Sequence, residues 1–166
     1  VMIGDGCLLY YPKHRIYGIE ITGNATEEPD YYDKIARFIK KEFNLESRIY
    51  IKYQPNGRGL KLVIYNKRLA EFMLNCGITT NKTYTITIAD DFLIWKKSKY
   101  ILRGIFETDG SLYFSKSKTK IDQPSYPRLE IKTASPLLAK QIMEILNKNG
   151  FRAHCHKNGS TEVIYL

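Results

Sequence analysis

The sequence predicts an α+β fold made of two similar units, each with the element order helix, two strands, helix, two strands, helix. Short landmarks recur in the same order about one hundred residues apart, and local helix and strand signals follow them in each half. The 166 residues suffice for one domain or for two small ones. We therefore expect an internal duplication.

Four landmarks occur twice, and their offsets drift only from 104 to 100 residues. They are Gly4-Asp5-Gly6 with Thr108-Asp109-Gly110, residues 34–44 with 137–147, Asn56-Gly57 with Asn158-Gly159, and Val63-Ile64-Tyr65 with Val163-Ile164-Tyr165. Any single match is compatible with chance, but four in one order favour duplication.

Strands are predicted directly after each Asp-Gly. Ile19 and Ile21 in the first unit, and Leu129 and Ile131 in the second, alternate with polar residues as in a half-buried strand. A basic turn at residues 12–15 separates the first two runs. Asn-Gly then predicts a second hairpin in each unit.

Helices follow the first strand pair of each unit. Apolar residues at helical spacing, such as Ile35 and Ile39, predict one helix, and Ser135-Pro136 supplies a cap and a first-turn proline for the other. A short amphipathic helix is predicted for residues 67–76, ending at Gly77. Its expected inward residues are Leu69, Phe72 and Met73.

These signals give a first repeat over residues 1–78, a linker over 79–98 and a second repeat over 99–166. The chain begins with Val1 inside what reads as the end of a helix, and the second repeat stops before a counterpart of helix 67–76. We expect it to be a piece of a longer chain, clipped at both ends.

The charge predicts a polyanionic partner. Lys and Arg number 26 against 17 Asp and Glu, a net charge of +9, alongside 13 Tyr residues. Residues 1–98 carry 15 basic and 11 acidic side chains, net +4, and residues 99–166 carry 11 and 6, net +5. Both halves are therefore expected to face one polyanion; a charge that serves only solubility is the alternative.

Three distant cysteines and the absence of a signal-peptide pattern indicate reduced thiols in an intracellular, non-secreted protein, in the cytoplasm, a nucleoid or an organelle matrix. No apolar run is long enough for a membrane span. The run His154-Cys155-His156 is not expected to bind zinc, because neighbouring strand residues point to opposite faces.

Asp5 and Asp109 are the candidate catalytic residues. Gly104 and Thr108 lie four apart on one face of the helix predicted to precede Asp109, and small residues at that spacing let two helices cross closely. Gly4 takes the place of Thr108 in the first repeat, so Asp5 and Asp109 are expected side by side. Two close carboxylates repel unless a divalent cation such as Mg²⁺ binds them. The alternative is that each Asp-Gly only ends a helix with a left-handed glycine.

The segments ILRGIFETDG, residues 101–110, and VMIGDG, residues 1–6, resemble the motif of the LAGLIDADG homing endonucleases, in their monomeric two-repeat form. The resemblance implies a pseudo-twofold pair of αββαββα repeats whose strands form a saddle over DNA. It also implies Asp5 and Asp109 as metal-binding and catalytic residues, with Gly4 and Thr108 as further metal ligands. Lys82 matches a basic position of the family, which implies a catalytic role in stabilising phosphate charge or the attacking hydroxide; the alternative is a solvated linker lysine. Mg²⁺ is the expected cofactor, and Mn²⁺ or Ca²⁺ can replace it for binding.

One face of each strand is then expected to contact DNA. Alternation with the apolar residues assigns Glu20, Arg48, Lys52, Gln54, Lys61, Arg128, Glu130 and Lys132 to this face. The family pattern adds Tyr11, Lys13, Tyr113, Ser115 and Ser117. The mixture of acidic, amide and aromatic side chains with basic ones favours sequence reading over phosphate binding alone, although each residue can also belong to an ordinary solvated face.

The predicted function is site-specific, divalent-metal-dependent hydrolysis of both strands of double-stranded DNA across the minor groove of a long, asymmetric target, in the mobility of an intron or intein. A monomer without membrane or small-molecule partners is expected. The alternatives are an intron RNA-binding maturase and a cleavage-inactive, sequence-specific DNA-binding protein.

Overall fold

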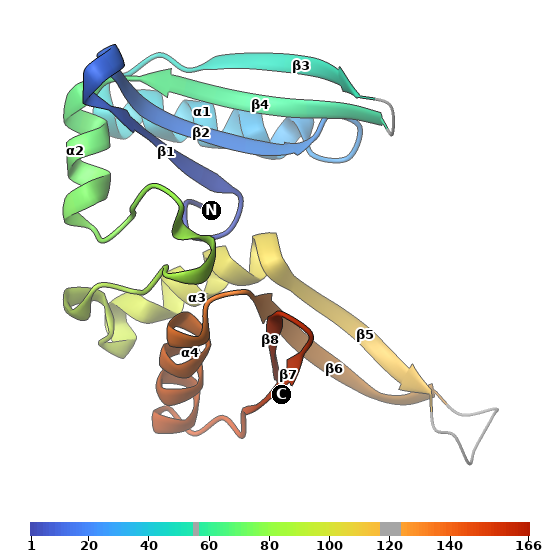
Figure 1. Cartoon of the computed structure of the whole chain (residues 1–166). Helices are drawn as coiled ribbons and strands as arrows, with labels where there is room; N and C mark the ends of the chain where they lie inside the picture. Colours follow the sequence, from blue (N-terminus) through green and yellow to red (C-terminus); the bar gives the residue numbers. More distant parts are fainter. Residues whose placement is uncertain (55–56, 117–123) are drawn as a thin grey trace. The chain divides into compact units, whose positions relative to one another are not determined.

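The computed structural model describes the backbone of residues 1–54, 57–116 and 124–166, and the side chains of these residues except 51–54, 57–58, 115–116 and 124–126. The chain divides into two compact units, Val1–Thr80 and Asn81–Leu166. Each unit contains one four-stranded antiparallel sheet with helices packed on one face (Figure 1). The predicted fold class is confirmed.

The first unit consists of β1 (Gly6–Tyr11), a short 3-10 turn η1 (Pro12–His14), β2 (Ile16–Asn24), α1 (Pro29–Phe43), β3 (Arg48–Gln54), β4 (Gly57–Tyr65) and α2 (Lys67–Asn75). Its strand order is β1-β2-β4-β3. α1 lies along one face of the sheet and α2 lies at its end (Figure 1). Residues 1–5 form turns ahead of β1.

Local signals set the ends of these helices. Pro29 occupies the first turn of α1, where its missing N–H removes no helical hydrogen bond. The side chain of Asn66 accepts a hydrogen bond from the Leu69 backbone N–H at 2.9 Å and so caps α2. Gly77 follows α2 with φ = 86°, the left-handed conformation that ends helices.

The core of the first unit lies between the sheet and its helices. Ile19 lies opposite Ile64 and Ile21 opposite Leu62, so these side chains share the helix-facing side of the sheet. All four are buried, and so is Tyr32 of α1. The predicted alternation of β2 is therefore confirmed.

The second unit contains short 3-10 turns η2 (Lys82–Tyr84) and η3 (Asp90–Phe92), followed by α3 (Trp95–Asp109), β5 (Gly110–Lys116), β6 (Pro124–Thr133), α4 (Pro136–Lys148), β7 (His154–Asn158) and β8 (Thr161–Tyr165). The strand order β5-β6-β8-β7 repeats that of the first unit. Ser135 caps α4 by accepting a hydrogen bond from the Leu138 N–H at 3.3 Å.

Segment 81–94 is packed against α4. The hydroxyl of Ser135 donates to the carbonyl of Ile86 at 2.8 Å. The Gln141 amide accepts from the Ile88 N–H at 2.7 Å and donates to the Ile88 carbonyl at 2.8 Å. Ile86 and Ile88 are both buried. These contacts fix the course of the segment that carries Lys82.

The strand registers correct one of the four repeat landmarks. Ile21 and Ile131 lie opposite the glycines of the two Asp-Gly pairs, so they occupy equivalent positions. Leu62 pairs with Ile21, and Ile164 pairs with Ile131, which gives an offset of 102 between β4 and β8. In the sequence the two Asn-Gly dipeptides share this offset, whereas the Val-Ile-Tyr match, at 100, is displaced by two residues.

Some residues predicted to face inward are exposed. Phe72 is 49% exposed and Leu129 is 38% exposed. Leu129 borders an apolar cleft of about 270 Å³ between α3, α4 and the second sheet. A second cleft, of about 330 Å³, lies between α1 and α2 in the first unit. Helical spacing and alternation gave these residues the correct face, but their neighbours do not cover them.

Candidate functional site

Asp109 is the last residue of α3, directly before β5. The hydroxyl of Thr108 lies 3.0 Å from the carbonyl oxygen of Ile105 and 3.3 Å from Oδ2 of Asp109. Thr108 can therefore bond either to its own helix or to the carboxylate. Oxygen atoms of a carboxylate and a hydroxyl thus lie together at the end of the helix.

Gly6 and Gly110 are required for close packing rather than for a left-handed turn. Gly110 has φ = −92°, an extended conformation open to any residue. A Cβ at Gly110 would overlap the ring and the carbonyl of Phe106, and a Cβ at Gly6 would lie 2.6 Å from the Cα of Met2. The alternative interpretation, in which left-handed glycines end the two motif segments, is therefore wrong.

Asp5 lies in the turn before β1, and its backbone carbonyl accepts a hydrogen bond from the Thr22 N–H at 3.4 Å. Its negative charge reaches the buried hydroxyl of Tyr32. Burial raises the pKa of Tyr32 strongly, and the charges of Glu28 and Asp5 raise it further. Gly23 lies against the same hydroxyl, where no Cβ fits.

Lys82 begins η2, and its carbonyl accepts hydrogen bonds from the N–H groups of Thr85 at 3.0 Å and Ile86 at 2.8 Å. Desolvation raises the pKa of Asp109, while the Thr108 hydroxyl and the positive charge of Lys82 act to lower it. Lys82 therefore acts electrostatically on Asp109 within the second unit, although 27 residues separate them in the sequence.

The metal site itself stays a prediction. Asp5 and Asp109 belong to different units, so their proximity stays a prediction. Within the described part of the chain, no three His, Cys, Asp or Glu side chains gather into a group that could hold a metal. The oxygen donors at Asp109 and Thr108 nevertheless fit the ligand preference of Mg²⁺.

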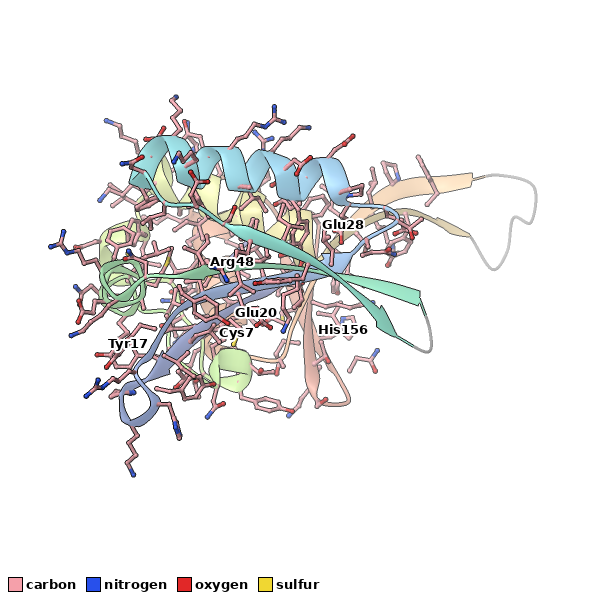
Figure 2. The ribbon with its side chains drawn as sticks, turned by 90° about the horizontal axis from the view of Figure 1, so that it is seen from above. Cys7, Tyr17, Glu20, Glu28, Arg48 and His156 are labelled. Atoms are coloured by element: carbon pink, nitrogen blue, oxygen red, sulfur yellow. The ribbon has the colours of Figure 1, made fainter. Side chains whose placement is uncertain are left out.

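The outer face of the first sheet, opposite α1, carries several predicted DNA-binding residues. Cys7, Glu20 and Arg48 follow one another across β1, β2 and β3 in one register row, with Val63 of β4 between the last two (Figure 2). The ammonium of Lys61 lies 2.8 Å from Oε1 of Glu20. Tyr11 is exposed at the end of β1, on the same face.

The outer face of the second sheet has a related arrangement. Tyr113 lies opposite Arg128, and its hydroxyl donates to Oε2 of Glu130 at 3.1 Å. The ammonium of Lys132 lies 2.8 Å from Oε1 of Glu130. The hydrogen bond from Lys132 lowers the pKa of Glu130, and the same hydrogen bond raises the pKa of Lys132.

The remaining five predicted DNA-binding residues lie either outside the strands or outside the described residues. Lys13 is exposed, but it lies in the turn η1 rather than in a strand, because Pro12 cannot continue the β1 ladder. Ser117 and the side chains of Lys52, Gln54 and Ser115 lie outside the described residues.

Sequence reasoning missed an aromatic cluster on the second outer face. The Tyr165 ring stacks on His154 with ring centroids 5.5 Å apart and contacts His156 edge-on at 5.6 Å. Tyr165 lies opposite Glu130, which places the cluster beside the predicted DNA-binding residues. Strand alternation put His154 and His156 on one face, but only the register identifies that face.

Comparison with known proteins agrees with this geometry. A family model described as "LAGLIDADG-like domain" matches residues 97–166, which include most of α3 and the sheet of the second unit. This part of the chain is therefore similar to LAGLIDADG-like domains. The resemblance to the LAGLIDADG family is thereby confirmed, and the matched residues include Asp109-Gly110.

Solved structures with a similar fold cover nearly the whole chain. Mesophilic variants of the homing endonuclease I-DmoI match with a TM-score of 0.67 and 20% identity, covering 99% of this chain and 82% of that one. I-DmoI in complex with DNA and Mn gives 0.66 and 20%, covering 99% and 83%. The homing endonuclease I-WcaI, bound to its DNA recognition sequence, gives 0.68 and 13%, covering 99% and 71%.

No curated protein matches the sequence. Cys7, Cys76 and Cys155 are free thiols. Among the described residues, no helix is both long and apolar enough to cross a lipid bilayer.

Proposed function

We propose that this protein is a site-specific, divalent-metal-dependent endonuclease that cuts both strands of a long, asymmetric DNA target across the minor groove. One observation carries the proposal. Each unit places an Asp-Gly at the start of the first strand of an identically ordered sheet, in a fold shared with homing endonucleases. Mobility of an intron or intein is the biological role that this activity implies.

Asp5 and Asp109 are the proposed metal-binding and catalytic residues, with Gly4 and Thr108 as further ligands. A bound Mg²⁺ would stabilise negative charge on the phosphate oxygens and lower the pKa of a water molecule. Solved I-DmoI complexes are described with DNA and Mn, with DNA and Ca, and with target DNA in the presence of Mg, which supports the choice of cation. Lys82 contributes positive charge near Asp109.

The outer faces of the two sheets are the proposed DNA-contacting surfaces. Their exposed residues combine hydrogen-bond donors and acceptors with basic groups, which allows base edges as well as phosphates to be contacted. The two faces differ in residue type at most equivalent positions. Unlike faces are suited to an asymmetric target, and a single chain with both faces is expected to act as a monomer.

The test uses the intact protein and a pool of plasmids with randomised inserts, incubated with Mg²⁺. Sequencing the cut ends identifies the target, and changing Asp109 to Asn should abolish cleavage of that target while its binding persists. Asp91, an exposed acidic residue of η3, provides a charge-matched control, since Asp91→Asn should cut like the parent. An Asp109→Asn variant that cuts at the parental rate would refute the catalytic assignment.

Salt dependence tests the phosphate contacts separately from cleavage. The logarithm of the duplex binding constant should fall linearly with the logarithm of salt concentration, by about 0.9 per phosphate contact. A flat response would contradict binding through the basic faces. Preference for structured intron RNA over duplex DNA, with no cleavage of either strand, would favour the RNA-binding alternative.

A further inference from the structure

Both units carry a glutamate-lysine ion pair at the same place on the outer face of the sheet. Glu20 and Glu130 precede the isoleucines that lie opposite the Asp-Gly glycines, so they occupy equivalent positions. Glu20 binds Lys61, and Glu130 binds Lys132, each with an N–O distance of 2.8 Å. The two glutamate side chains are only 21% and 12% exposed.

The two lysines come from different strands. Lys61 belongs to β4 and lies opposite Thr22 of β2. Lys132 belongs to β6, at the position equivalent to Thr22, and lies opposite Val163 of β8. The lysine therefore lies on β4 in the first unit and on β6 in the second, whereas its partner glutamate occupies the equivalent position in both units. The pair, rather than the position of either lysine, is the shared feature.

Stability does not explain the shared pair. Lys61 and Lys132 have side chains that are 35% and 58% exposed, and ion pairs of this kind stabilise a fold by about 0–1 kcal/mol. The ion pair has a larger effect on how strongly each lysine attracts an anion. An ammonium bonded to a carboxylate offers less net charge to a DNA phosphate, and the phosphate must also approach that carboxylate.

We propose that Glu20 and Glu130 are specificity-determining residues, which restrain Lys61 and Lys132 from binding the phosphates of non-target DNA. This inference rests on the proposed function. A duplex attracted only through its backbone must compete with each glutamate, so its binding is weakened. A target that presents a donor to the glutamate, such as the cytosine amino group, releases the lysine for a phosphate. Discrimination then comes from weakening the wrong complexes.

The test measures binding of a labelled random-sequence duplex by fluorescence anisotropy, in EDTA and over a series of salt concentrations. Glu20→Gln and Glu130→Gln should each raise the affinity at 0.1 M salt by about eightfold, the gain expected from one additional phosphate contact. One additional phosphate contact should steepen the dependence of log K on log salt by about 0.9. Adding Lys61→Met to Glu20→Gln should remove the gain, because no released lysine remains.

Glu46→Gln and Glu144→Gln provide matched controls. Each removes one negative charge and frees a lysine, Lys40 on α1 or Lys140 on α4, away from the outer faces. Both should change the affinity less than twofold.

Equal gains in the controls and in the two sheet variants would overturn the inference, because net charge alone would then explain the effect. Unchanged affinity and salt slope in Glu20→Gln and Glu130→Gln would also overturn it. Failure of the proposed function gives a different result, since the parent protein would then cut no plasmid in Mg²⁺, whatever affinities these variants show in EDTA.

Discussion

Gln141 provides the sharpest test of how the Lys82 segment is held. Its side-chain amide makes both backbone hydrogen bonds of Ile88, at 2.7 and 2.8 Å, as a neighbouring strand would. Ile88 is 2% exposed, so water does not readily replace these bonds. Gln141→Met keeps the length of the side chain and removes both hydrogen-bonding atoms. The buried N–H and C=O of Ile88 then lose their partners.

The expected loss of stability follows from these two groups. Leaving one buried donor or acceptor without a partner costs about 1–3 kcal/mol. Better packing of the methionine offsets part of this cost, which leaves about 2 kcal/mol for the pair. For a unit of this size, 1 kcal/mol shifts the midpoint of thermal unfolding by about 4–8 °C, so a decrease of about 8–16 °C is expected.

Trp95 makes the measurement specific to the second unit. It is the only tryptophan of the chain, and it lies in α3 against Phe151 with ring centroids 6.0 Å apart. Urea unfolding followed by Trp95 fluorescence gives the free energy of unfolding. Glu144→Gln, an exposed substitution on the same helix, should stay within about 0.5 kcal/mol of the parent. A Gln141→Met protein within that same range would refute the reasoning.

Three further predictions concern stability. Ser135→Ala should cost the second unit about 1–3 kcal/mol, because the cap of α4 and a buried hydrogen bond are lost together, whereas the exposed Ser160→Ala should have little effect on the same fluorescence measurement. Gly110→Ala should cost about 1–3 kcal/mol through overlap with Phe106, and an unchanged urea midpoint would contradict that packing. The raised pKa of Tyr32 keeps its proton bound in the folded state, while the unfolded chain releases it above about pH 10. Stability should therefore fall as pH rises past 10, and Tyr32→Phe should reduce this fall; equal losses in both proteins would rule out Tyr32 as its cause.

Much of the fold followed from local sequence patterns. The alternation around Ile19, Ile21 and Ile131 identified the buried faces of β2 and β6 correctly. Ser135-Pro136 and Gly77 marked helix ends correctly, because caps and left-handed glycines act over only a few residues. Phe72 was wrongly expected to be buried. Its exposure depends on which other elements reach it, and periodicity carries no such information.

The residues of the candidate site could be predicted from the sequence, but the contacts between them could not. Asp5 and Asp109 were predicted from a repeated motif, and Lys82 from its resemblance to a family position. The link between Lys82 and Asp109 required the path of segment 81–94, which hydrogen bonds to α4 determine. The cluster around Tyr165 was missed because its position depends on strand pairing.

The sequence by itself determined the duplication, the order of the elements and the residues that end each motif, because these depend on spacing along the chain. The tertiary structure decided which residues of different strands meet. The register put Lys61 beside Glu20, whereas Lys132, two residues along its own strand, meets Glu130. A shift of one residue would turn every side chain of a strand to the other face. Ladder hydrogen bonds and core packing across the whole sheet fix that register, which no single segment specifies.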